Sequence, residues 1–193
     1  MLSNLFRGRL VRLACQDVDK DAASWARWST DSELLRLRNG DPARPRTAKY
    51  YQDEEARRPV TGSRFAFDIR LLEAGRLIGF TSLWVANWAN AEGWVGIFIG
   101  ERTDWGQGYG TDAMRVLLRY AFAELNLARV SLATFATNTR AIRSYQKAGF
   151  SLEGAPREVV QRDGRRSDDA IMGILRDEWR SREWTAPSKA GSV

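Results

Sequence analysis

A run of alternating glycines stands directly before a long segment of helical apolar periodicity: Gly106, Gln107, Gly108, Tyr109 and Gly110. The first N–H groups of a helix have no partner within the helix, and the helix dipole adds partial positive charge there. Glycine lets a phosphate approach these donors closely because it has no Cβ. The pattern predicts that the backbone amides of about Gln107 to Thr111 bind a pyrophosphate, and a plain connecting loop is the alternative.

Better-known phosphate motifs do not fit this loop. The stretch "WGQGYGT" is not GxxxxGK[ST], which excludes a nucleoside-triphosphate P-loop, and it is not GxGxxG. It contains GxGxG, but no acidic residue ends a second strand at the distance that a dinucleotide-binding fold requires. The loop alone therefore leaves the phosphate site and the connector equally open.

The choice of catalytic groups is narrow. The chain has no histidine and one cysteine, Cys15, so Ser-His-Asp chemistry, Cys-His chemistry and most zinc sites are excluded, and no metal is expected. A general base must then be a carboxylate, a water or a backbone group. Glu33, Glu92 and Glu101 could bind or deprotonate an amine, although each fits an exposed carboxylate better.

Composition sets further bounds. A chain of 193 residues with 44% hydrophobic and 28% charged content predicts one globular domain. The net charge of +6 favours anionic partners. Four arginines gather near the C-terminal hairpin, but without interleaved aromatics they are a weak signal for nucleic acid: Arg157, Arg162, Arg165 and Arg166.

No apolar run reaches membrane-spanning length, and the start lacks the apolar core of a signal peptide. Together with the single cysteine, this predicts a cytoplasmic protein without membrane partners.

Hydrophobic periodicity predicts a mixed sheet flanked by helices. The clearest strand is "RFAFDIRLL", in which Phe65, Phe67 and Ile69 alternate with polar residues and one face is buried. The other predicted strands are residues 9–14, a partner strand "LIGFTSLWV", residues 93–100 and 129–135, and a hairpin around "RDG"; the helices are "DVDKDAASWARWS", "DSELLRLRN", "AKYYQDEEARR", residues 111–125 and "NTRAIRSYQKAG". The fold class is α+β with α/β character, in a single domain 1–193 with a core at about 9–179 and a weakly structured tail at 181–193.

Two stretches in these contexts resemble a known family. "WGQGYGTDA" resembles the acetyl-CoA loop of the GCN5-related N-acetyltransferase (GNAT) superfamily, and "NTRAIRSYQKAGF" resembles its downstream helix. "GRLIGFTSL" and "RDGRRSDDAIMGIL" are similar to the branch of ribosomal-protein N-terminal acetyltransferases and spermidine acetyltransferases. The resemblance covers about Arg9 to Trp179. Two residues depart from the pattern: Trp105 stands where Gln or Arg is usual, and Gln146 stands where Glu is usual.

The resemblance implies a GNAT fold, in which a splayed strand pair forms the acetyl-CoA cleft. It implies contacts to the cofactor from Phe98, Ile99 and Gly100 at a strand end, from Gly106, Gln107, Gly108, Tyr109, Gly110 and Thr111 in the loop, and from Asn138. It also implies that Tyr145 protonates the leaving thiolate. The alternative for Asn138 is a plain helix cap, and for Tyr145 a half-buried packing aromatic.

The implied reaction is direct acetyl transfer from acetyl-CoA to a primary amine, without a covalent acyl-enzyme. A non-catalytic CoA-binding module and a basic nucleic-acid-binding protein are the competing hypotheses. The acceptor stays open among a protein α-amine, a polyamine, an aminoglycoside and a small metabolite, with a slight preference for a peptide. Homodimer formation is also left open.

Overall fold

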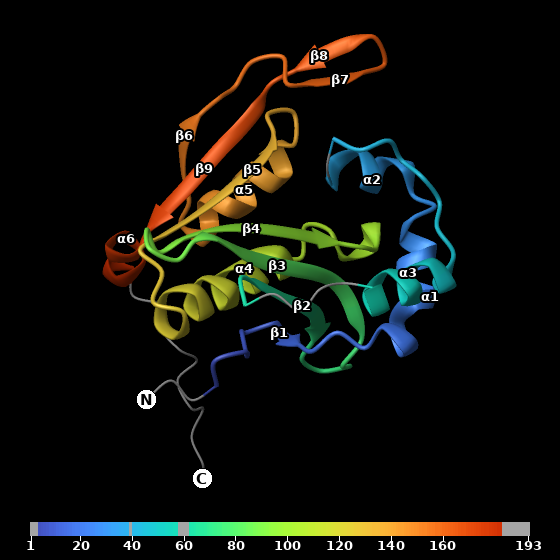
Figure 1. The fold of residues 1–193 in the computed structure, drawn as a ribbon, viewed down its shortest axis with the longest axis horizontal. Helices are drawn as coiled ribbons and strands as arrows, with labels where there is room; N and C mark the ends of the chain where they lie inside the picture. The colour runs from blue at the N-terminus through green and yellow to red at the C-terminus, as the bar shows by residue number, and fades with distance from the viewer. Residues whose placement is uncertain (1–3, 39, 58–61, 183–193) are drawn as a thin grey trace.

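A computed structural model describes residues 4–38, 40–57 and 62–182 of the chain (Figure 1). Most of the tail predicted from residue 181 therefore lies outside the described residues. Ser181 itself ends the helix α6 (Arg176–Ser181).

The described part is built on one mixed sheet of seven strands. Their order across the sheet is β1-β2-β3-β4-β5-β9-β6, and β7 and β8 form a separate pair. The strands are β1 (Val11–Ala14), β2 (Arg64–Leu71), β3 (Leu77–Asn87), β4 (Glu92–Ile99), β5 (Arg129–Phe135), β6 (Ser151–Gly154), β7 (Val160–Arg162), β8 (Arg165–Ser167) and β9 (Asp169–Leu175). Among the strand pairs of this sheet in the described residues, only β4–β5 is parallel, as the strand–loop–helix–strand order predicts.

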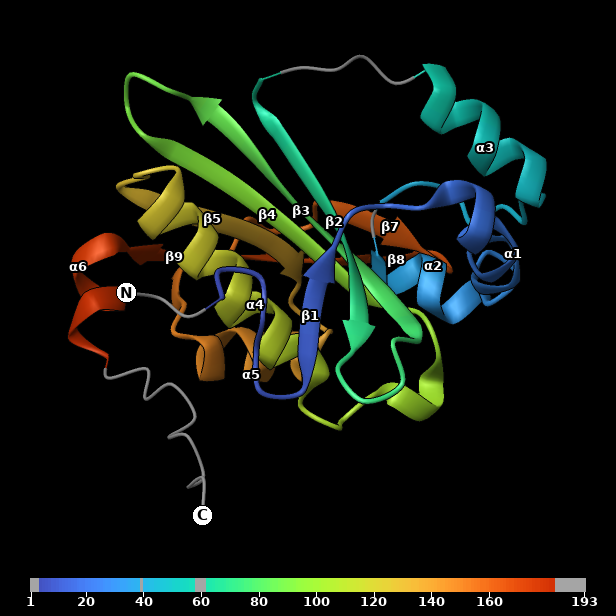
Figure 2. The same cartoon turned by 90° about the horizontal axis from the view of Figure 1, so that it is seen from below.

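The helices fall into two groups. The helices α4 (Tyr109–Arg119) and α5 (Thr139–Ala148) cover one face of the sheet (Figure 2). The helices α1 (Val18–Trp28), α2 (Ser32–Arg38) and α3 (Ala48–Arg57) gather at one end, and β4 points toward them (Figure 1). The carboxyl end of β4 therefore lies between the two groups.

The helix after the glycine loop differs from its predicted range of 111–125. It begins at Tyr109 because Gly108, in the left-handed conformation at φ 84°, is its N-cap. After Arg119 the chain forms a π-helical turn, Tyr120–Glu124, in which the N–H of Leu125 bonds to the carbonyl of Tyr120. The core face of α4 includes Ala113, Met114, Val116, Leu117 and Leu118.

The C-terminal strands are only partly as predicted. The turn Asp163–Gly164, with both φ angles positive, closes the expected hairpin between β7 and β8. β9 instead enters the main sheet between β5 and β6. The sequence did not predict β6.

Part of the second face of β2 is also buried, contrary to the prediction of a single buried face. Asp68 and Arg70 on that face are buried together with Asp21 of α1. The Arg70 guanidinium contacts Asp21 and lies 3.2 Å from Asp68 Oδ2, while Asp68 Oδ1 has no hydrogen-bond partner in the described part of the chain. Burial raises the pKa of Asp68 to about 7, because the opposing effect of Arg70 is partly offset by the second carboxylate, Asp21.

Replacing Asp68 by asparagine should change how stability depends on pH. The folded-state pKa of about 7 lies above the ordinary value of 3.8, so the parent protein loses stability as the pH rises between about 4 and 7. Asp68→Asn removes this loss, and Arg70 keeps Asp21 as a partner. The Tm of the variant relative to the parent should be higher at pH 8 than at pH 5, by at least about 2–4 °C, which is the shift that about 1 kcal/mol produces at this chain length.

Thermal unfolding at both pH values, followed by circular dichroism, measures this difference. Asp19→Asn, at an exposed position of α1, the helix that carries Asp21, is the control and should show no such pH dependence. An equal Tm difference at pH 5 and pH 8 for Asp68→Asn would contradict the prediction.

Candidate active site

The parallel strands β4 and β5 separate after three residue pairs. Their pairing comprises Glu92–Arg129, Gly93–Val130 and Trp94–Ser131. Beyond these pairs β4 continues to Ile99 and β5 to Phe135, and residues of both strand ends line one cavity of about 860 Å³. The resemblance predicted this splayed pair.

The backbone of β4 offers hydrogen-bonding groups to the gap. The N–H of Gly100 donates to Ile78 of β3, and the carbonyl of Gly96 accepts from the Thr81 hydroxyl of β3. Because backbone groups of alternate residues point to opposite edges of a strand, the N–H groups of Ile97 and Ile99 point toward β5 and the gap. An extended, amide-rich ligand can therefore pair with β4 as an added strand does.

The glycine loop closes the cavity at the start of α4. Gly106 and Gly108 have φ angles of 79° and 84°, a region that favours glycine. Gly110 has no such backbone requirement, and a Cβ there would lie 3.7 Å from the nearest atom of the protein, the Ser144 hydroxyl oxygen. Protein packing therefore leaves space at Gly110, and this space lies in the cavity beside the first N–H groups of α4. These features fit a pyrophosphate.

Cationic side chains line the cavity around this loop, as an anionic ligand requires. The lining set contains Arg9, Arg115, Arg140, Arg143 and Lys147.

Trp105 takes a structural part in place of the usual Gln or Arg. Its indole N–H donates to the carbonyl of Ile99 at 2.8 Å, and the Arg140 guanidinium lies 3.6 Å from its ring centroid. Trp105 thus joins the end of β4 to the start of α5.

Side chains beside the loop fix the elements that carry it. The hydroxyls of Thr111 and Ser144 are 2.8 Å apart and join α4 to α5. The Asp112 carboxylate accepts hydrogen bonds from three successive backbone N–H groups, those of Arg9, Leu10 and Val11. Asp112 therefore ties the entrance of β1 to α4.

Asn138 is the N-cap of α5, because its Oδ1 accepts a hydrogen bond from the N–H of Ala141 at 3.2 Å. It also lines the cavity. Asn138 is therefore a helix cap, and its additional contact with the cofactor stays a prediction.

Tyr145 lies on α5 and lines the same cavity. Its half-buried ring packs at 64° against Phe150, with 6.2 Å between the ring centroids. Burial raises the pKa of Tyr145 to about 12. The phenol therefore keeps its proton throughout the neutral range and can act only as a proton donor there.

Two of the predicted cofactor residues do not line the cavity. Gln107 is absent from the lining set. Gly100 is buried, and a Cβ there would lie 2.0 Å from a ring atom of Trp28, so packing requires glycine. The remaining predicted residues do line it: Phe98, Ile99, Gly106, Gly108, Tyr109, Gly110, Thr111, Asn138 and Tyr145.

The three candidate glutamates lie outside the cavity lining. Glu101 accepts hydrogen bonds from Arg27 and Trp28, and Glu33 pairs with Arg102 at 2.6 Å. Burial raises the pKa of Glu101, but the bonds from Arg27 and Trp28 outweigh this effect and lower the pKa overall. Asp169, which the sequence did not single out, is a carboxylate that lines the cavity.

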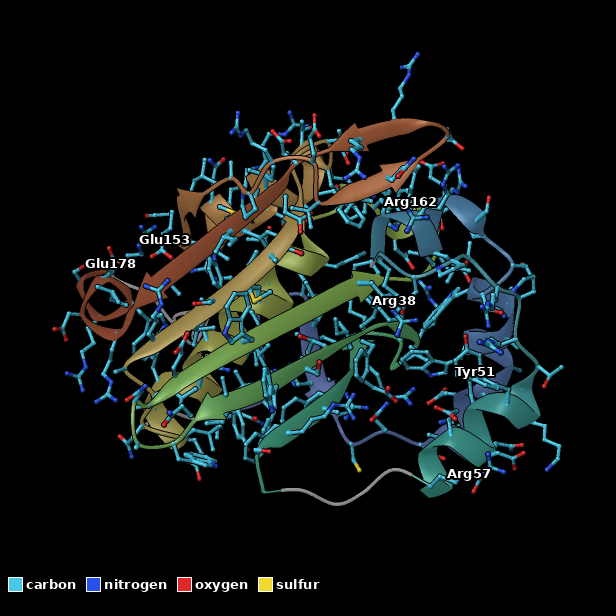
Figure 3. The ribbon with its side chains drawn as sticks, turned by 45° about the horizontal axis from the view of Figure 1, so that its top comes forward. Arg38, Tyr51, Arg57, Glu153, Arg162 and Glu178 are labelled. Carbon is cyan, nitrogen blue, oxygen red and sulfur yellow. The ribbon has the colours of Figure 1, made fainter. Side chains whose placement is uncertain are left out.

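Arg38 of α2 lines the cavity, whereas Arg162 of β7 does not. Arg38 places its guanidinium 4.9 Å from the ring centroid of Phe98 at the end of β4 (Figure 3). Arg162 on β7 donates to the backbone carbonyl of Asp41, at 3.2 Å, and thereby joins the hairpin to the loop after α2 (Figure 3).

Within residues 4–38, 40–57 and 62–182, no group of His, Cys, Asp or Glu side chains is arranged to hold a metal ion. In the same ranges no helix is long and apolar enough to cross a membrane.

Comparison with known proteins agrees with this geometry. The family "Acetyltransferase (GNAT) domain" matches residues 12–151. "Probable N-acetyltransferase YjcK" of Bacillus subtilis is 31% identical over 139 residues, which span 67% of this chain and 76% of that protein. "Uncharacterized N-acetyltransferase p20" of Bacillus licheniformis is 28% identical over 120 residues, which span 62% of this chain and 67% of that protein.

Solved structures share the fold. A spermidine N-acetyltransferase from Vibrio cholerae, crystallised with CoA and spermine, superposes with a TM-score of 0.74 at 20% identity, over 88% of this chain and 98% of that one. The matched family, the related sequences and the shared fold lead to one conclusion. The chain belongs to the GNAT family and is an acetyl-CoA-dependent N-acetyltransferase.

Proposed function

We propose that this enzyme acetylates the α-amine of a peptide by direct attack on acetyl-CoA. The observation that carries the proposal is the single cavity that joins the glycine loop, the separated ends of β4 and β5, and Tyr145. Along this cavity, a phosphate site would be followed by the free strand edge of β4 for the extended pantetheine arm and then by a proton donor, Tyr145.

Named residues fit each part of the cofactor. The N–H groups at the start of α4 and the cations Arg115 and Lys147 would hold the phosphates. The backbone of Ile97 and Ile99 would pair with the amides of the pantetheine arm. Acetyl-CoA supplies the acetyl group as a thioester, which an amine can attack.

Direct attack suits the available nucleophiles. The only cysteine, Cys15, is exposed and is not part of the cavity lining. The sequence has no histidine to activate a hydroxyl. An amine acceptor can be the nucleophile itself once it is neutral.

The charges of the cavity favour an acceptor with a single amine. Of the described residues, six cationic side chains and three carboxylates line it. Arg76 already binds Asp104 through two hydrogen bonds, and backbone N–H groups bind Asp112. A polyamine carries several positive charges and would find one uncommitted carboxylate, Asp169.

Proton chemistry points the same way. A peptide α-amine has a pKa of about 7.7–8.0, against about 10.4 for a lysine-like amine, so far more of it is neutral at pH 7. Among the relatives, "Putative ribosomal N-acetyltransferase YdaF" of Bacillus subtilis is 32% identical over 109 residues, which span 59% of that protein. Its name supports a protein acceptor, whereas the spermidine enzyme is similar at the level of the fold.

Tyr145→Phe should lower kcat at least about tenfold, because the phenol would protonate the leaving thiolate and a general acid contributes about 10²–10⁴-fold. The ring keeps its packing against Phe150, so acetyl-CoA affinity and Tm should stay near the parent values. Since the pKa of Tyr145 is about 12, the parent rate should show no alkaline loss from this group below about pH 11.

Steady-state kinetics with calorimetric binding of acetyl-CoA checks this prediction. Tyr120→Phe, a half-buried tyrosine outside the cavity lining, is the control for ring packing and should retain the parent rate. Turnover of Tyr145→Phe within about twofold of the parent, with chemistry rate-limiting, would show that Tyr145 is only a packing residue.

The acceptor is tested by release of free CoA with short peptides and with spermidine. We expect kcat/KM for a peptide with a free N-terminus to exceed that for spermidine by at least about tenfold, or about 1.4 kcal/mol. The same peptide with a blocked N-terminus is the control and should be inert. Faster turnover of spermidine than of every peptide would refute the peptide assignment while leaving amine acetylation intact.

A further inference from the structure

One carboxylate of the cavity has no assigned role. Asp169 is the first residue of β9 and pairs with Phe135, the last residue of β5. Its backbone N–H donates to the carbonyl of Pro156 at 3.0 Å, which fixes the residue where β5 and β4 have already separated. Both Asp169 and Phe135 line the cavity.

Strand alternation places Asp169 on the side of the sheet opposite the main core. Ala170, Met172 and Ile174 are the buried apolar residues of β9, and the latter two belong to the core against which Tyr145 packs. Asp169 alternates with these residues and therefore lies on the other face. The carboxylate and the phenol thus reach one cavity from opposite sides of the separated strands.

Asp169 is also the uncommitted acid of the lining set. Its Oδ1 is buried and has no hydrogen-bond partner among the described residues. Asp104 and Asp112, by contrast, are bound by Arg76 and by backbone N–H groups. A buried carboxylate oxygen without a donor is costly, so its presence in a cavity points to a ligand that supplies the donor.

We propose that Asp169 binds the acceptor amine and takes up its proton; this inference rests on the proposed acetylation of an amine. An ammonium group supplies the missing donor and an opposite charge. Burial raises the pKa of Asp169, which makes the carboxylate a stronger base than an exposed aspartate.

Asp169 and Tyr145 together account for every proton transferred in the proposed reaction. Asp169 takes one proton from the ammonium and later releases it to solvent. The neutral nitrogen forms the C–N bond with the acetyl carbon while the C–S bond breaks. The thiolate takes the proton of Tyr145, and the second proton lost by the nitrogen restores the phenol through solvent. The products are the amide, CoA thiol and one proton.

The test compares Asp169→Asn with the parent, using a peptide amine and acetyl-CoA. We expect kcat/KM to fall at least about tenfold, with unchanged acetyl-CoA affinity by calorimetry. Asp168→Asn is the matched control: this neighbouring carboxylate accepts from the N–H of Glu158 and does not line the cavity, so its rate should stay at the parent value. Asp169→Ala is a second variant with the same expected loss in kcat/KM. If one of the two variants does not fold, the other still tests the proposal.

A weakly basic acceptor separates proton removal from general damage. A hydrazide is neutral at pH 7, so it needs no base before attack, and its rate should depend much less on Asp169 than the rate of the peptide amine. An equal loss with both acceptors, a rate within about twofold of the parent, or a weakened affinity for acetyl-CoA would each overturn the role. If the parent enzyme itself acetylates no amine, the proposed function fails instead.

Discussion

The separation of β4 from β5 is the constraint on which the site depends. After three residue pairs the two strands no longer share a ladder, although β3 and β9 still hold their outer edges. Unpaired strand edges are otherwise covered or blunted in stable proteins, because they bind other strands. Here the gap is flanked by α4 and α5, so the N–H groups of Ile97 and Ile99 face a cavity that a ligand of defined shape can fill.

Several contacts keep the gap open with the glycine loop at its end. The Thr111–Ser144 contact holds α4 beside α5, and Asp112 fastens the start of β1 to α4. Trp105 ties the end of β4 to Arg140 on α5. These cavity-lining residues thus serve as structural supports, a role that tryptophan can fill in place of the Gln or Arg that is usual in the family.

Local signals predicted much of this arrangement. The strand β5 has the predicted bounds, 129–135, because its β-branched and apolar residues lie between clear turn signals. Asn138 caps α5, and Gly149, at φ 114°, ends it, as their side-chain and backbone preferences indicate. The glycine loop and Tyr145 line one cavity although Gly110 and Tyr145 are 35 positions apart in the sequence, since the βαβ connection brings both to the same end of the sheet.

What the sequence did not predict depends on pairing between distant strands. The position of β6 beside β9 and the burial of Asp68 against α1 follow from tertiary packing that no local pattern encodes. Asp169 belongs to the same class. The stretch "SDDA" around Asp169 is typical of the polar start of a strand. Only the register that pairs Asp169 with Phe135 places it in the cavity. The glutamates that the sequence suggested are instead held in ion pairs or lie away from the cavity.

Amide hydrogen exchange, resolved by residue in NMR, tests the central claim most directly. On saturation with CoA, the amides of Ile97 and Ile99 and those of Tyr109 to Thr111 should exchange at least about tenfold more slowly, because the ligand supplies the acceptors that the gap and the helix start lack. The amide of Gly100, already bonded to Ile78 of β3, is the internal control and should change little by comparison. If CoA binds but Ile97 and Ile99 gain no more protection than Gly100, the separated edge of β4 does not hold the cofactor and the account is contradicted.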